Sequence, residues 1–172
     1  YTFEVQDVPA ICAVARERGV LTMIDNTWAS PVFARPFDWG VDVSVLALTK
    51  YWSGHSDLLM GAAVVREPLW PRLWSAVRQL GQCVSGDDAY LVMRGLRTAE
   101  VRMQRHQENA LAVAHWLQRR AEVESVLHPA LFSHPQHALW RRDFSGASGL
   151  FSFSLEPSMF ASDARRRAAI AA

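Results

Sequence analysis

The chain has 172 residues, which is enough for one domain with a substantial hydrophobic core. Half of the residues are hydrophobic, a fifth are charged and the formal net charge is +1, so the composition gives no strong attraction to nucleic acid or to a membrane surface. No apolar run approaches the ~20 residues of a membrane-spanning helix, and the opening residues do not have the pattern of a signal peptide. Cys12 and Cys83 are not spaced as a metal or redox motif, so we expect a reduced, cytoplasmic protein.

The first half of the chain predicts helices that alternate with buried strands. Residues 8–18 predict an amphipathic helix, with Pro9 in its first turn and Gly19 as its stop. Three short apolar runs have the pattern of buried strands in a parallel sheet: residues 20–25, 41–48 and 61–67. This alternation predicts an α/β fold with a mostly parallel sheet and flanking helices.

The second half of the chain becomes mainly helical. Two helices are expected between Asp87 and Leu117, and the second has a predicted buried face formed by Ala110, Val113, Ala114 and Leu117. Residues 123–129 and 148–155 predict two further strands, and the segment between them predicts a connecting loop with a short helix.

The stretch LALTKYWSGHSDLLMG, residues 46–61, contains Lys50, which is the only lysine of the chain beside seventeen arginines. A lysine amine can lose its proton and attack a carbonyl carbon to form a Schiff base, whereas a guanidinium group stays protonated in proteins. One lysine in an arginine-rich chain can also arise by chance. Composition alone therefore assigns Lys50 no role.

The position of Lys50 relative to Asp25 is more informative. Both residues lie at or just beyond the C-terminal end of a predicted strand, and ligands of open parallel sheets bind outside those ends. A lysine and a carboxylate facing one crevice suit pyridoxal phosphate (PLP), because the lysine binds the aldehyde and the carboxylate keeps the ring nitrogen protonated. Asp25-Asn26-Thr27 is also turn chemistry, so Asp25 alone would be interpreted as a turn or cap residue. Because Lys50 lies at the end of the next strand, Asp25 and Lys50 together favour a PLP site over a turn role for Asp25 alone.

Two neighbouring residues have alternative interpretations. The Thr49 hydroxyl could contact the cofactor phosphate, although a β-branched residue is also common at a strand end. His55, in the sequence Gly54-His55-Ser56-Asp57, has no candidate nucleophile or metal ligands nearby, so we expect it to stabilise its own loop.

Four motifs in order, MIDNTWASP, ALTKYWSGHSD, YLVMRGLRT and FSGASGLFSFSL, resemble the Cys/Met-metabolism family of PLP-dependent enzymes. The resemblance extends from about residue 2 to about residue 155. Residues 24–28 and 40–45 are most similar to the cystathionine β-lyase branch, and γ-acting relatives more often carry Phe in place of Trp28.

The resemblance implies a fold and a set of site residues. The fold is the fold-type I, aspartate aminotransferase-like α/β fold. Residues 1–147 would belong to its large PLP-binding domain, and residues 148–172 would begin a small C-terminal domain that is truncated or divergent after about residue 156. Lys50 matches the Schiff-base lysine and Asp25 the partner of the pyridine nitrogen. Thr49 matches a phosphate-contacting hydroxyl, and Thr27 matches a pocket residue beneath the ring.

The resemblance also implies an activity. A carbon–sulfur lyase of this type would act on an amino-acid thioether, and β-elimination from cystathionine would give homocysteine, pyruvate and ammonia. A γ-lyase or γ-synthase is the alternative, and a non-catalytic truncated remnant is a second one. The intact enzyme is expected to be a homo-oligomer, because relatives build their active sites between subunits.

Several features of such relatives are not found in this chain: the phosphate-binding helix N-terminus, the tyrosine that stacks on the ring and the arginine that binds the substrate carboxylate. We therefore expect a fragment that is inactive and aggregation-prone in isolation, because its sheet would have open edges. Nucleic-acid binding through Arg119-Arg120 or Arg165–Arg167 is disfavoured by the small net charge.

Overall fold

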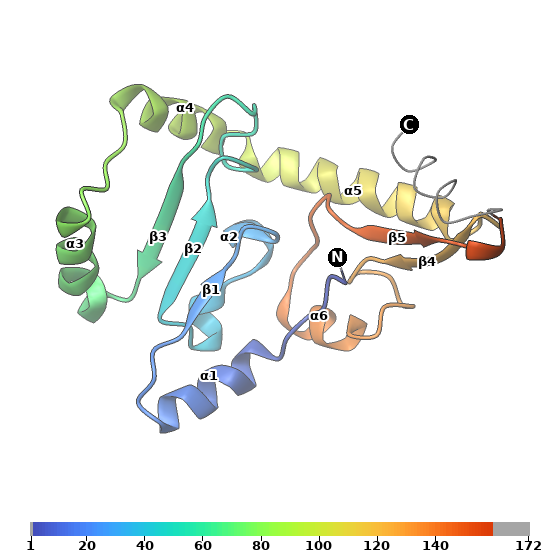
Figure 1. Cartoon of the computed structure of the whole chain (residues 1–172), viewed down its shortest axis with the longest axis horizontal. Coiled ribbons are helices and arrows are strands. Elements are labelled where there is room, and N and C mark those ends of the chain that lie inside the picture. The colour runs from blue at the N-terminus through green and yellow to red at the C-terminus, as the bar shows by residue number, and fades with distance from the viewer. Residues whose placement is uncertain (1, 160–172) are drawn as a thin grey trace.

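The structure is a computed structural model that describes residues 2–159, so the arginines at 165–167 and most of the segment expected to diverge lie outside the described residues. A three-stranded sheet with the order β1-β2-β3 is formed by Met23–Asp25, Val43–Ala47 and Gly61–Val65 (Figure 1). A second sheet pairs β4 (Val123–Leu127) with β5 (Ser152–Leu155) in antiparallel fashion. All five predicted strands are therefore present, with slightly shorter bounds.

The expected parallel sheet is confirmed for one pair of strands and wrong for the other. β1 and β2 are parallel, with Met23 opposite Val43, whereas β2 and β3 are antiparallel, with Ala47 opposite Gly61. A parallel connection needs a crossover of a dozen or more residues, usually a helix. Residues 48–60, here called the lysine loop, contain no helix and return the chain directly, so β3 pairs in the opposite direction.

The helices are largely those predicted. α1 (Val8–Glu17) begins after Asp7, whose carboxylate accepts a hydrogen bond from the Ala10 N–H at 3.2 Å. α4 (Gly86–Leu96) and α5 (Ala99–Leu117) are the expected pair, and α6 (His137–Asp143) is the expected short helix. Two further helices were not predicted, α2 (Ser30–Phe33) and α3 (Trp70–Gln79). Short 3-10 helices cover Pro36–Trp39, Glu67–Leu69 and Pro157–Met159.

α5 connects the two sheets, and Figure 1 shows it running from the vicinity of the lysine loop to the β4–β5 sheet. Its buried residues are Ala99, Met103, Ala110, Ala114 and Leu117. Met103 packs with Phe33 and Ala29 near the lysine loop, whereas Leu117 packs with Val126 under the second sheet. The predicted buried position at Val113 is wrong, because its side chain is 48% exposed.

The pairing of β4 with β5 places residues 123–127 beside the segment that follows residue 148. The division of the chain at residue 147 into a large and a small domain stays a prediction. None of the helices in residues 2–159 is long and apolar enough to cross a membrane.

Candidate active site

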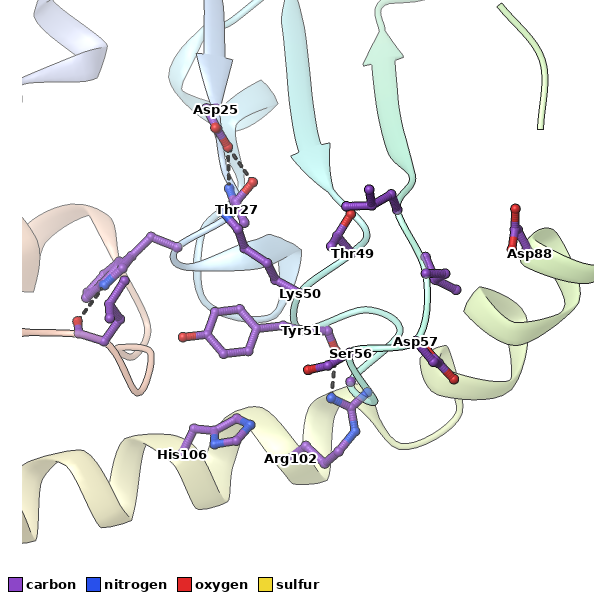
Figure 2. Close-up of a pocket in the computed structure, with 15 residues that line it drawn as sticks. Asp25, Thr27, Thr49, Lys50, Tyr51, Ser56, Asp57, Asp88, Arg102 and His106 are labelled. Atoms are coloured by element: carbon purple, nitrogen blue, oxygen red, sulfur yellow. Dashed lines mark hydrogen bonds between the residues drawn. The ribbon is translucent and has the colours of Figure 1, made fainter. Parts of the chain in front are cut away.

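The end of β1 and the lysine loop line a pocket of about 1160 Å³. Asp25, Thr27 and Trp28 contribute one wall, and Thr49, Lys50 and Tyr51 contribute a second. Asp88 from α4 and Arg102 and His106 from α5 also line it, together with residues 54 and 56–59 of the lysine loop and Leu150 (Figure 2). The four residues predicted from the sequence, Asp25, Thr27, Thr49 and Lys50, are therefore brought together at one edge of the sheet.

Thr27 ties the end of β1 to the end of β2. The Asp25 carboxylate Oδ1 accepts hydrogen bonds from the backbone N–H of Thr27, at 2.8 Å, and from the Thr27 hydroxyl. The Thr27 Oγ1 in turn accepts from the Ala47 N–H at 2.8 Å. The turn interpretation of Asp25 is confirmed, because one carboxylate oxygen closes the turn. The side chain also lines the pocket, and its role as the partner of a pyridine nitrogen stays a prediction.

Lys50 follows β2 in a turn, where its N–H donates to the Ala47 carbonyl at 3.2 Å. Its side chain is exposed, and in Figure 2 it extends from the lysine loop toward Asp25 and Thr27. Among the described residues no carboxylate forms an ion pair with the Lys50 amine. The amine is therefore open to a ligand in the pocket.

The Thr49 hydroxyl is engaged within the protein. Its Oγ1 donates to the Met60 carbonyl at 3.1 Å and accepts from the Met60 N–H at 3.0 Å. These bonds close the base of the lysine loop directly beside Lys50. Contact between Thr49 and a phosphate stays a prediction. The interpretation of His55 as a residue that stabilises its own loop is confirmed, because its Nδ1 lies 2.6 Å from the Ser53 carbonyl oxygen.

Tyr51, Arg102 and His106 are among the pocket residues that sequence reasoning did not identify. Tyr51 lies next to Lys50, and its ring packs against the His106 ring with centroids 5.5 Å apart. Arg102 and His106 are four residues apart and lie on the same face of α5, a spacing that the sequence contains. Burial lowers the pKa of the Arg102 guanidinium, because a charged group loses solvation inside the protein. Nothing in the sequence showed that this face of α5 meets the lysine loop.

The donor set suits pyridoxal phosphate. The Lys50 amine can bind an aldehyde carbon, and the Asp25 carboxylate can hold a proton on a pyridine nitrogen. Thr27 and Thr49 also line the pocket.

Comparisons with known proteins agree with this chemistry. The family model for Cys/Met metabolism PLP-dependent enzymes matches residues 1–169. The chain is 48% identical over 157 residues to the cystathionine β-lyase of Escherichia coli, which covers 90% of this chain and 40% of that protein. It is 45% identical over 155 residues to the L-alanine/L-glutamate racemase of Wolbachia pipientis, which covers 90% of this chain and 38% of that protein. The chain thus spans about two fifths of the length of these curated relatives.

The fold is also similar to solved structures. A cystathionine γ-synthase from Xanthomonas oryzae pv. oryzae, in complex with aminoacrylate and cysteine, superposes with a TM-score of 0.90 at 39% sequence identity. The match covers 97% of this chain and 42% of that chain. This similarity confirms the fold-type I α/β fold, and with the family match it shows that the chain belongs to the Cys/Met-metabolism family of PLP-dependent enzymes.

Proposed function

We propose that the protein is a PLP-dependent carbon–sulfur lyase that acts on cystathionine by β-elimination. The observation that carries the proposal is the placement of the chain's only lysine, Lys50, in one pocket with Asp25 and Thr27. The similarity to a β-lyase and the presence of Trp28 support the β reaction.

Two residues would hold the cofactor. Lys50 would bind its aldehyde carbon through the amine, and Asp25 would keep its ring nitrogen protonated through the carboxylate. When bound, PLP supplies a conjugated ring that accepts the electron pair left at the substrate Cα. The hydrogen bonds of Asp25 Oδ1 to Thr27 fix the carboxylate at the end of β1, so its orientation does not depend on the ligand.

Lys50 would also move the proton. With substrate bound, the free Lys50 amine would accept the Cα proton as a general base. The Cα electron pair then forms a double bond to Cβ while the Cβ–S bond breaks, and the sulfur leaves as the thiolate of homocysteine. Addition of water to the remaining three-carbon unit gives pyruvate and ammonia.

The alternative is a γ-lyase or γ-synthase reaction, which shares the first proton transfer to Lys50. The high TM-score to a γ-synthase structure supports this γ reaction as the alternative function. Product analysis with cystathionine separates the two, because β-elimination gives pyruvate and γ-elimination gives 2-oxobutyrate. Because the chain is also similar to an amino-acid racemase, a third measurement tests for racemisation by following the loss of optical activity of L-alanine or L-glutamate.

The experiment that tests the cofactor site uses the single lysine. The purified protein is incubated with PLP and reduced with borohydride, and the adduct is mapped by mass spectrometry with the N-terminal amine as internal reference. We expect the label to favour Lys50 over the terminus and to be lost from that position in Lys50→Arg. Label on the terminal amine alone would contradict the proposal.

We also propose a cytoplasmic homo-oligomer. Several apolar side chains are exposed, among them Leu59, which lines the pocket, and Tyr90 and Met93 on α4. A second copy of the chain would remove such surface from water. Sedimentation of the purified protein as a monomer would contradict this part of the proposal.

A further inference from the structure

The lysine loop is shaped by hydrogen bonds between its own backbone groups. The Gly54 N–H donates to the Lys50 carbonyl at 2.8 Å, and the Ser53 N–H donates to the Leu48 carbonyl at 3.0 Å. The Ser53 hydroxyl donates to the Thr49 carbonyl at 3.0 Å. These bonds engage the carbonyls before and at Lys50 but not those of the two residues that follow it.

Arg102 binds both of those following carbonyls. Its Nη1 donates to the Tyr51 carbonyl at 2.6 Å, and its Nη2 lies 3.4 Å from the Trp52 carbonyl oxygen. Nη2 also donates to the Gly95 carbonyl at 2.9 Å, and Nε donates to the Thr98 hydroxyl at 3.1 Å. Figure 2 shows the Arg102 side chain pointing from α5 toward the lysine loop. One planar guanidinium thus joins the end of α4, the start of α5 and the residues after Lys50.

The charge of Arg102 is not used in an ion pair, because no carboxylate in residues 2–159 lies within ion-pair distance of it. All of its acceptors are neutral oxygens, and burial lowers its pKa. The several donors of a guanidinium, rather than a single charge, match this set of diverging acceptors.

Two glycines permit the close approach. A Cβ at Gly54, where φ is +75°, would lie 2.3 Å from the Arg102 Nη1. A Cβ at Gly95 would lie 2.3 Å from the carbonyl oxygens of Trp52 and Ser53. The lysine loop therefore packs against the end of α4 and against Arg102 only because both positions lack a side chain.

We propose that Arg102 is a positioning residue that fixes the lysine loop and thereby the direction in which Lys50 enters the pocket. The inference rests on the proposed function, in which Lys50 binds PLP. The Tyr51 and Trp52 peptide groups follow Lys50 in the chain, so freeing their carbonyls gives the lysine backbone additional conformations. A lysine that samples many directions reacts more slowly with a ligand held at the end of β1, because productive geometry becomes a smaller fraction of the ensemble.

The test compares Arg102→Gln with Arg105→Gln. Arg105 is an exposed arginine on the same helix, and its guanidinium pairs with the Glu108 carboxylate at 3.2 Å. The first readout is amide hydrogen exchange of residues 51–54 in protein freed of cofactor, which reports the lysine loop without any activity. The second is the rate at which borohydride traps PLP on Lys50. For Arg102→Gln we expect exchange at least about tenfold faster and trapping at least about tenfold slower. Arg105→Gln should match the wild type in both readouts.

If Arg102 only stabilised the fold, its replacement would raise amide exchange throughout the chain, including β2 and the centre of α5. Such a uniform increase, or wild-type exchange at residues 51–54, would overturn the proposal. Arg102→Lys gives a second comparison that keeps the charge, and we expect it to restore trapping only in part. If Arg102→Gln does not fold, the Lys variant carries the comparison, and its wild-type behaviour in both readouts would overturn the proposal.

The two proposals fail separately. If wild-type protein is not labelled at Lys50 in preference to the terminal amine, the cofactor assignment is wrong. Hydrogen exchange at residues 51–54 would still decide whether Arg102 fixes the lysine loop.

Discussion

The indole Nε1 of Trp28 donates a hydrogen bond to the Leu150 carbonyl at 2.9 Å, across 122 positions of the sequence. Both residues line the pocket that contains Lys50. The bond therefore joins the end of β1 to the segment that leads into β5, and it gives Trp28 a physical role in the fold.

Trp28→Phe keeps a ring at this position but removes the donor. We expect the free energy of unfolding to fall by about 0.5–1.5 kcal/mol, the usual contribution of one hydrogen bond. Urea denaturation measures the change. Trp39→Phe is the matched control, because Trp39 packs against the same Phe144 ring as Trp28 but has no hydrogen bond from its indole nitrogen among the described residues. An equal loss in both variants would mean that ring size, and not the bond to Leu150, is responsible.

Asp25→Asn separates the turn from the charge. The Asn side-chain oxygen can still accept from the Thr27 N–H, so stability should change by less than about 1 kcal/mol. Asn cannot hold a proton on a pyridine nitrogen. In a protein that contains this chain and has the full length of the relatives, we expect turnover of cystathionine to fall by roughly 10²-fold or more. Asp38→Asn, at an exposed position, serves as the control. Wild-type turnover in Asp25→Asn would show that Asp25 is only a turn residue.

Gly95→Ala tests the packing of α4 against the lysine loop. The added Cβ would lie 2.3 Å from two carbonyl oxygens, and relief of that contact requires the backbone to move. We expect a loss of about 1–3 kcal/mol in the free energy of unfolding, the range seen for overpacked sites. Gly86→Ala, in the same helix, adds a methyl group with no atom within 4 Å and should change stability by no more than about 0.5 kcal/mol. Similar urea midpoints for the two variants would contradict this expectation.

His128 should make stability depend on pH. Its side chain is fully buried, and burial lowers its pKa to about 4. In the unfolded chain a histidine titrates near ~6.5, so between these values the unfolded state binds more protons than the folded state. The free energy of unfolding should therefore fall as the pH drops from ~6.5 toward 4. Above ~6.5 His128 is neutral in both the folded and the unfolded chain, so this loss of stability should be absent.

His128→Asn removes the titrating ring but retains an acceptor for the Ala130 N–H, which now lies 3.1 Å from Nδ1. Urea midpoints measured across that pH window should vary less steeply in this variant. Part of the slope should remain, because burial also lowers the pKa of His134. His55→Asn, at an exposed position in the lysine loop, controls for the replacement itself, because His55 is not among the groups that lower the pKa of His128. A slope unchanged by His128→Asn would contradict the prediction.

Local patterns in the sequence were sufficient for most elements. The apolar periodicity of α1, α4 and α5 lies within each segment, as do the side-chain caps of α1 and α4, so a few neighbouring residues specify these helices. α3 was missed although Pro71 in its first turn and Gly81 after its end were both available as signals. Val113 was misassigned because it lies at the edge of the apolar face of α5, where neighbouring contacts decide burial.

By itself the sequence determined that Lys50 and Asp25 lie close together, because a lysine and an acid at the ends of two strands must meet at one edge of a sheet that pairs those strands in parallel. Only the tertiary structure decided the direction of β3, the approach of Arg102 to the Tyr51 carbonyl and the bond between Trp28 and Leu150. Those contacts join residues between 14 and 122 positions apart in the chain. No local pattern encodes them, since they depend on how finished elements pack against one another.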